Sequence, residues 1–470
     1  MIEMQSQIDD PDNQIIPEES YNEMRKKIFA IAWPVLLELV LASLFGMVDM
    51  MIVGNYNNQQ YSAAAGVAAI GMINQPILIS LALIQALGVG GTALISRYYG
   101  AKKLDRLETV AKHVLVLSFF FVAIPLAVIL FVFQEEILVT LGAEPDALMV
   151  GLTYFKWVII GFLFLSITLS LSANLRGIGE TRIPMKVNIV ANGMNMILSL
   201  LLVNGYSIFP EMGVSGAGFA TMLSNVISAA LVFIYVSLGK SKLPFNPFEP
   251  FRFNRHIMRR VVQVGLPSAG EQLILRLGII LYLRMVAGLG TVVLAAHQIS
   301  LNITSLTFTP GAALGIASSA LVGQALGAER ANQAERYARY TSKVAMAIGL
   351  FMGLLFFFLG EQIGALYSSD EAIIKNVGMV MAIIAVIQPF QCSQLTTAGA
   401  LRGAGDTIFP MISVLICILG VRVLTAYVLI YKFNLGLAGA WYAVLADQLI
   451  RSIMIRWRFN SGVWKNIVLS

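Results

Sequence analysis

The sequence predicts an all-α integral membrane protein with twelve transmembrane helices, arranged as two parallel six-helix repeats (N- and C-lobes) around a central cavity. Composition is the first indication: 57% of the residues are hydrophobic and 12% are charged, whereas soluble domains carry about 25% charged residues. Apolar runs of bilayer-spanning length are the second. These runs lack the alternation of barrel strands, so we expect helices. A duplicated motif, described below, is the third.

Twelve apolar segments define the expected spans. They are residues 28–53, 61–97, 110–133, 148–172, 184–204, 214–238, 260–287, 292–326, 337–360, 372–399, 408–431 and 435–457. The second and the eighth are too long for one straight crossing, and they contain the helix breakers Pro76 and Pro310. We therefore expect these two helices to bend or to extend beyond the bilayer.

Lysine and arginine lie mainly in alternate connections between the spans. The basic set comprises Arg97, Lys102, Lys103, Arg106, Arg176, Arg182, Lys186, Arg252, Arg255, Arg259, Arg260, Arg330, Arg336 and Arg339. The other set has few basic residues apart from Lys375 and Lys432. By the positive-inside rule the basic set is cytoplasmic, and both termini fall on that side, as an even number of spans requires. The net charge of +6 reflects this distribution and not a nucleic-acid partner.

The chain divides into two similar halves. The motif Leu175-Arg176-Gly177-Ile178-Gly179-Glu180-Thr181 returns as Leu401-Arg402-Gly403-Ala404-Gly405-Asp406-Thr407. Six spans in each half make the two repeats parallel, and two complete repeats make a monomer sufficient. The expected division is a polar cytoplasmic tail (1–27), the N-lobe (28–238), a cytoplasmic linker (239–259), the C-lobe (260–458) and a second cytoplasmic tail (459–470).

Two carboxylates on the first span are the main functional candidates. Asp49 follows Glu38 by 11 residues, close to three helical turns, so both lie on one helical face. Ionisable side chains inside a membrane are costly and are functional hypotheses by default. An apolar environment favours the neutral carboxyl group, and reversible protonation is what a cation-coupled antiporter needs. The alternatives are that Asp49 braces the external helix end and that Glu38 has a packing role.

Glu271, the repeat partner of Glu38, is the third expected coupling carboxylate. Arg276 follows five residues later, and an ion pair between the two would keep Glu271 charged and prevent exchange. On the twelfth span, Asp447 and Arg451 have i,i+4 salt-bridge spacing, and Arg422 on the preceding span is placed to join them. We interpret four charged residues of the C-lobe as a structural network. They are Arg276, Arg422, Asp447 and Arg451.

Uncharged polar side chains indicate where a cavity lies. Spacings of three and four residues place a polar stripe on the fifth span, made of Asn188, Asn192, Asn195 and Ser199. The alternative for this stripe is hydrogen bonding between helices. His297 is either a proton relay or, more simply, a hydrogen-bonded interior residue. The remaining cavity candidates are Gln75, Gln272 and Gln388.

Both motif copies lie at cytoplasmic helix ends and lack the Lys-Ser/Thr of a phosphate-binding loop. Their glycines permit tight turns and their arginines suit the membrane interface, so we interpret them as gate or hinge loops. The residues concerned are Arg176, Gly177, Gly179, Arg402, Gly403 and Gly405. The two cysteines, Cys392 and Cys417, lie in apolar runs, so we expect neither a disulfide framework nor a metal cluster.

The chain resembles the multidrug and toxic compound extrusion (MATE) family over about residues 25–460. The matching features are Pro34 and Glu38 followed by Val48-Asp49-xxx-Val53-Gly54, both motif copies, Gly265-Leu266-Pro267-Ser268-Ala269-Gly270-Glu271-Gln272, and Leu294-Ala295-Ala296-His297-Gln298-Ile299. The resemblance implies secondary antiport in the plasma membrane by two helix bundles that form a V, without a cofactor. It implies export of bulky, often cationic and aromatic compounds in exchange for protons or sodium ions. It also implies that Asp49 matches the acidic residue of the family's first span.

Two departures from the family pattern bear on the coupling ion. Ser199 stands where many family members place an aspartate, and the tenth span contains no acidic residue. A sodium cage of several oxygen ligands is harder to build with fewer carboxylates. We therefore expect protons to be the coupling ion, with sodium as the alternative.

Other functional classes fit the sequence less well. A lipid-linked oligosaccharide flippase shares the broad architecture, but it should have a strongly cationic cavity, whereas the N-lobe interior contains Glu38 and Asp49. A membrane-embedded enzyme would cluster His, Asp or Ser at one interface, and the three histidines are scattered. No filter segment of the channel type repeats. Cation-coupled export of small organic cations is the prediction.

Overall fold

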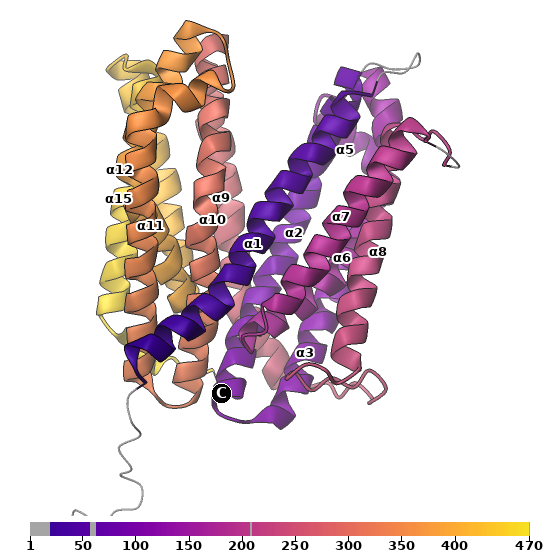
Figure 1. The fold of residues 1–470 in the computed structure, drawn as a ribbon, viewed down its shortest axis with the longest axis vertical. Coiled ribbons are helices and arrows are strands. Elements are labelled where there is room, and N and C mark those ends of the chain that lie inside the picture. Colours follow the sequence, from indigo (N-terminus) through magenta and orange to yellow (C-terminus); the bar gives the residue numbers. More distant parts are fainter. Residues whose placement is uncertain (1–18, 57–62, 207–208, 470) are drawn as a thin grey trace, which may run out of the picture.

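The computed structural model describes residues 19–56, 63–206 and 209–469, and every regular element in these ranges is a helix. Figure 1 shows two groups of helices that meet at the lower end and diverge towards the upper end, and the C-terminus lies at the lower end between them. This arrangement confirms the predicted all-α, two-lobe architecture.

The N-lobe is built from the first six predicted spans. Its first two spans are α1 (Tyr21–Gly54) and α2 (Ala63–Gly100). The third span consists of α3 (Leu104–Val116), the π-helical η1 (Leu117–Ala123) and α4 (Ile124–Val132). The short α5 (Gln134–Thr140) follows, and the last three spans are α6 (Pro145–Gly177), α7 (Arg182–Asn204) and α8 (Val214–Ser237). Pro76 lies within α2, which runs as one helix of 38 residues. At 1.5 Å per residue such a helix exceeds the bilayer core of about 30 Å, as predicted.

The C-lobe repeats this order with two changes: its third span is one continuous helix, and its fifth span is interrupted. Its helices are α9 (Arg255–Ala287), α10 (Thr291–Gly327), α11 (Ala331–Ala365) and α12 (Glu371–Ala404), then an interrupted span of α13 (Ile408–Val414), π-helical η2 (Leu415–Arg422), α14 (Val423–Tyr427) and π-helical η3 (Val428–Lys432), followed by α15 (Gly436–Asn460) and a 3-10 turn, η4 (Val463–Asn466). The interrupted span corresponds to the continuous α7 of the N-lobe.

Eleven helical segments among the described residues are long and apolar enough to cross a membrane. The twelfth predicted span, α15, is not one of them, because it contains Asp447, Arg451, Arg456 and Arg458. Asp447 and Arg451 are nevertheless buried inside the lobe, where they are shielded from lipid. The charges of α15 are therefore compatible with its place in the C-lobe.

The first helix of each lobe begins in contact with residues of the opposite lobe. Met24 and Ile28 of α1 belong to an apolar cluster with residues of α10, α11, α12 and α15. Ile257 and Val261 of α9 belong to a cluster with residues of α2, α3, α6 and α8. Helix α1 starts at Tyr21, so residues 21–27, which we assigned to a polar tail, are the first turns of a membrane helix.

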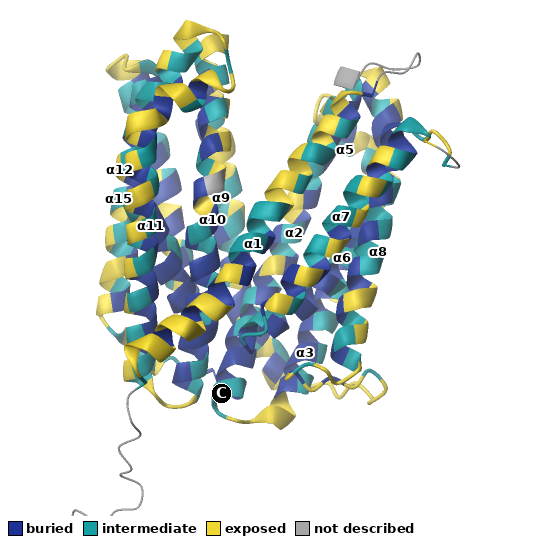
Figure 2. Ribbon diagram, in the orientation of Figure 1, coloured by how far each residue is buried: buried dark blue, intermediate teal, exposed yellow. Residues whose placement is uncertain are grey.

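The lobes also meet through backbone contacts at the lower end in Figure 1. Gly100 of α2 lies so close to α10 that a Cβ atom on it would be 1.9 Å from the carbonyl oxygen of Gln324. Gly327, at the matching place of α10, lies equally close to the carbonyl oxygen of Arg97. Figure 2 shows the buried residues concentrated in this lower region. Small residues that let helix backbones touch are typical of tight membrane interfaces, so the two lobes close the molecule at this end.

Candidate functional site

Asp49 and Ser199 face each other between α1 and α7. Ser199 Oγ donates a hydrogen bond of 2.7 Å to Asp49 Oδ1. Ser199 is buried, whereas Asp49 is half-buried. Within the described ranges, no lysine or arginine forms an ion pair with Asp49. Asp49 is therefore held by a neutral hydroxyl group and not by a counter-charge.

Glu38, on the same helix, has a different environment. Arg176 Nη2 lies 2.6 Å from Glu38 Oε1, and Asn188 Nδ2 donates a hydrogen bond of 2.5 Å to the same oxygen. Glu38 is 5% exposed. The side chain of Arg176, in the first motif copy, therefore points into the lobe and pairs with Glu38. It is not only a residue of a gate loop at the membrane interface.

The C-lobe repeats this ion pair. Arg402 Nη2 of the second motif copy lies 2.5 Å from Glu271 Oε1, and Glu271 is also 5% exposed. The alternative in which Arg276 pairs with Glu271 is not found, because Glu271 pairs with Arg402. Arg276 is half-buried on α9 and forms no ion pair with the described residues, so it does not belong to the predicted network. The reason is geometric: five residues along a helix place two side chains on different faces.

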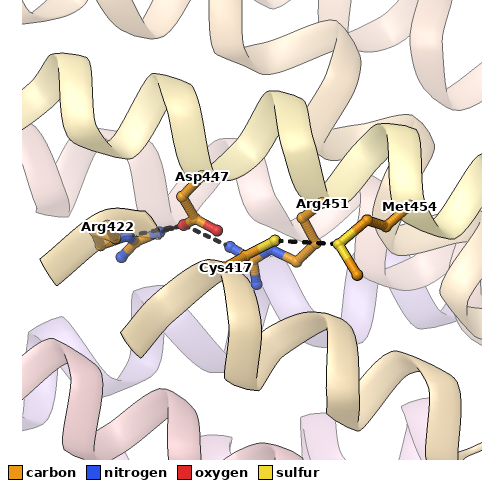
Figure 3. Close-up of polar contacts among 5 residues, drawn as sticks. All are labelled: Cys417, Arg422, Asp447, Arg451 and Met454. Carbon is orange, nitrogen blue, oxygen red and sulfur yellow. Dashed lines mark hydrogen bonds and ion pairs between the residues drawn. The ribbon is translucent and has the colours of Figure 1, made fainter. Parts of the chain in front are cut away.

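The other three members of the predicted network do meet (Figure 3). Asp447 Oδ2 accepts hydrogen bonds from Arg422 Nε at 2.8 Å, from Arg422 Nη2, and from Arg451 Nη2 at 2.9 Å. Asp447 is fully buried. The i,i+4 spacing and the neighbouring span therefore predicted these contacts correctly.

The polar stripe of α7 is shared between two neighbouring helices. Asn188 and Ser199 contact the carboxylates of α1, as described above. Asn192 Nδ2 bonds to the backbone oxygen of Asn188 at 2.8 Å, and Asn195 Nδ2 donates to Thr221 Oγ1 of α8 at 3.1 Å. The two ends of the stripe therefore contact α1, and Asn195 links α7 to α8.

The remaining cavity candidates are distributed over both lobes. His297 is 1% exposed and lies between the rings of Tyr282 and Trp441, with ring centroids 5.6 Å and 5.5 Å away. Gln388 is buried and donates to Thr307 Oγ1 at 2.8 Å, which joins α12 to α10. Gln75 is exposed on α2 and Gln272 is half-buried on α9. Among the described residues, none of these four side chains forms a hydrogen bond with Asp49, which bonds to Ser199.

Both motif copies form the same turn. Gly179 and Gly405 have φ angles of +87° and +90°, which favour glycine. The amide of Glu180 bonds to the Leu175 carbonyl at 2.9 Å, and the amide of Asp406 bonds to the Leu401 carbonyl at 2.8 Å. The predicted tight turns are present, and they fix the helix ends that carry Arg176 and Arg402.

Sequence reasoning missed the two glutamate–arginine pairs. The signal was present, since a glutamate in the first span and an arginine in the motif recur together in each half. It also missed Arg97, which is 9% exposed and donates from α2 to the carbonyl oxygen of Ala404 in the C-lobe at 3.2 Å. No local pattern distinguishes Arg97 from the other basic residues that follow the spans.

Comparison with known proteins identifies relatives along nearly the whole chain. The sequence model of the MatE family matches residues 34–201 and 267–428. A probable multidrug resistance protein NorM of Thermotoga maritima is 30% identical over 453 residues, which cover 96% of this chain and 95% of that protein. Multidrug resistance protein MdtK of Pectobacterium atrosepticum is 26% identical and covers 93% and 95%.

Solved structures show the same fold. One described as the outward-facing conformation of a multidrug resistance MATE family transporter of the MOP superfamily has a TM-score of 0.85 at 22% identity, and covers 94% of this chain and 97% of that one. MATE in the straight conformation has a TM-score of 0.84 at 21% identity, with 93% and 97% covered. The chain belongs to the MatE family of multidrug efflux transporters and is a multi-pass membrane transporter, not an enzyme.

Proposed function

We propose that this transporter exports cationic or amphipathic organic compounds in exchange for protons, and that Asp49 is the coupling carboxylate. One observation supports this role for Asp49. Of the four carboxylates that the sequence places inside spans, Glu38, Glu271 and Asp447 are each bound by an arginine. Among the described residues, Asp49 is instead bound by the hydroxyl group of Ser199. An ion-paired carboxylate favours its charged form and exchanges a proton only after the pair breaks.

The environment of Asp49 suits competition between a proton and a cationic compound. A negative charge without a counter-ion is costly at membrane depth. A bound proton removes that charge, and a bound organic cation compensates it. Because Ser199 occupies Oδ1, both occupants would use Oδ2, and binding of one would displace the other. Mutually exclusive binding is the minimum requirement for exchange.

The two lobes provide the conformational part of the mechanism. The backbone contacts at the cytoplasmic ends correspond to a state closed on that side, and alternating access would require the lobes to separate there. In this proposal Glu38 and Glu271 hold the helix ends of each lobe, with coupling as a secondary role. We place both termini in the cytoplasm and the protein in the plasma membrane, as a monomer.

The test is dye transport by the purified protein in liposomes, with an imposed pH gradient and no sodium. Wild-type protein should move a cationic dye only when the gradient is present, and Asp49→Asn should reduce the rate to that of empty liposomes. Glu361→Gln, which changes an exposed carboxylate of α11, is the matched control and should transport normally.

Three outcomes would contradict parts of the proposal. Wild-type transport by Asp49→Asn would exclude Asp49 as the coupling residue. Transport that needs a sodium gradient would replace protons with sodium and leave export intact. Absence of dye transport under both gradients would favour the lipid-linked oligosaccharide flippase.

A further inference from the structure

Residues 462–469, the last that the structure describes, lie between the lobes at the ends that we place on the cytoplasmic side. After α15 ends at Asn460 the chain turns and forms η4. Trp464 is fully buried, its ring stacks on Phe459 with centroids 5.1 Å apart, and its Nε1 donates to the Phe459 carbonyl oxygen at 2.8 Å. These contacts anchor the segment 462–469 to the C-lobe.

The end of this segment packs against the other lobe. Leu469 is 5% exposed and belongs to the apolar cluster that also contains Tyr98, Leu107 and Leu175 of the N-lobe. Ile467 packs against both this cluster and that of the C-lobe. The methyl groups of Leu469 cover Gly405, where a Cβ atom would lie 2.6 Å from Leu469 Cδ1. The segment therefore joins the second motif turn to the N-lobe core.

Polar contacts hold the same segment from three helices. Arg97 Nη2 of α2 donates to the Ile467 carbonyl oxygen at 2.9 Å, and the same atom bonds to Ala404 of α12. Arg260 of α9 donates to the Val468 carbonyl oxygen. Lys465 Nζ lies 2.5 Å from Glu335 Oε2 of α11. The buried Arg97 thus connects the N-lobe with both the C-lobe and the terminal segment.

We propose that residues 462–469 form an intramolecular latch that stabilises the state closed on the cytoplasmic side. Opening on this side separates α2 from α9 and α10, so a segment attached to both lobes must detach from one of them. Trp464 anchors the latch to α15, and Leu469 with Arg97 forms the contact that opens. This inference rests on the alternating access of the proposed function, but on neither the coupling ion nor the substrate.

The experiment measures distances between spin labels across the cytoplasmic side. Labels at Lys103→Cys and Arg330→Cys report lobe separation, because both positions are exposed in the turns that follow α2 and α10. Cys392→Ala and Cys417→Ala remove the native thiols. A chain that ends at Ser461, and full-length Leu469→Asp, should each raise the population of the longer distance at least about threefold.

Val468→Asp is the matched control. The side chain of Val468 is 66% exposed, and only its backbone oxygen takes part in the latch, so its distance distribution should equal that of the wild type. Leu469→Ala, which removes packing without adding charge, decides the question if the shortened chain fails to fold. Unchanged distances in folded Leu469→Asp and Leu469→Ala would overturn the latch. If the distances change in these variants but the wild-type protein shows no ion-coupled transport, the proposed function is overturned and the latch stands.

Discussion

The two lobes place different chemistry at matching positions of the same scaffold. Asp49 lies 11 residues after Glu38, and Tyr282 lies 11 residues after Glu271. Asp49 contacts the hydroxyl group of Ser199. The ring of Tyr282 instead lies 5.8 Å from the guanidinium carbon of Arg422. The N-lobe therefore keeps a carboxylate without a counter-charge where the C-lobe has an aromatic ring beside a paired arginine.

The fifth spans of the two lobes also differ, in this case in their type of helix. In the N-lobe, α7 is a continuous α-helix that presents Ser199 to α1. In the C-lobe the corresponding span contains two π-helical segments, and Arg422 is the last residue of the first one. Extra residues per turn shift side chains around the helix axis, and π-helical turns are frequent at functional sites. Here they accompany the binding of Arg422 to Asp447.

The glutamate–arginine pairs, by contrast, are the same in both lobes. A contact that appears in both repeats belongs to the scaffold, and one that appears in a single repeat is the better candidate for the specific function. We therefore propose that coupling is a property of the N-lobe. The following predictions test it, beginning with the largest expected effect.

The sharpest test pairs Asp49→Asn with Tyr282→Phe. Asp49→Asn removes the one span carboxylate that has no arginine partner among the described residues, and it should abolish gradient-driven dye transport. Tyr282→Phe keeps the ring beside Arg422 and should leave the rate within about twofold of the wild type, since only a hydroxyl group is lost. Dye flux in liposomes measures both. Loss of coupling in Tyr282→Phe would place the exchange site in the C-lobe and break the comparison.

Asp447→Asn should act on stability. The change leaves Arg422 and Arg451 buried without a counter-charge, and removing one partner of a buried pair costs about 3–5 kcal/mol. The thermal denaturation midpoint of the detergent-solubilised protein should fall by several degrees. Asp49→Asn serves as the control and should denature like the wild type, because Asp49 has no ionic partner. A stable Asp447→Asn variant without transport would instead assign the coupling to the C-lobe network.

The smallest effects are expected at the duplicated pairs. Glu38→Gln and Glu271→Gln each leave an arginine unpaired, at a cost of about 1–3 kcal/mol. The loss should be smaller at Glu38, because Asn188 donates to the same oxygen and can still do so in the variant. Double-mutant cycles of thermal stability, with Arg176→Gln in one lobe and Arg402→Gln in the other, should give similar coupling energies. A coupling energy near zero in one lobe would show that the pair is not part of the common scaffold.

Much of the fold follows from patterns that a single helix can express. The length and apolarity of the runs predicted the spans, eleven of which are, among the described residues, helices long and apolar enough to cross a membrane. The repeated motif predicted the two lobes. The pairing of Asp447 with Arg451 follows from i,i+4 spacing on one helix. The tight turns at Gly179 and Gly405 follow from the motif glycines. Apart from the recurrence of the motif, these features depend on residues close together in sequence.

The partners of the remaining charged residues depend on tertiary structure. Glu38 and Arg176 are 138 residues apart, Glu271 and Arg402 are 131 apart, and Asp49 and Ser199 are 150 apart. Helical periodicity tells which residues share a face, but the packing of neighbouring helices sets which face meets which. The sequence by itself determined that this chain is a twelve-helix membrane protein with two carboxylates on one face of its first span. Only the packed structure decided that Glu38 meets an arginine and that Asp49 does not, because the rotation of each helix is set by its contacts with the others.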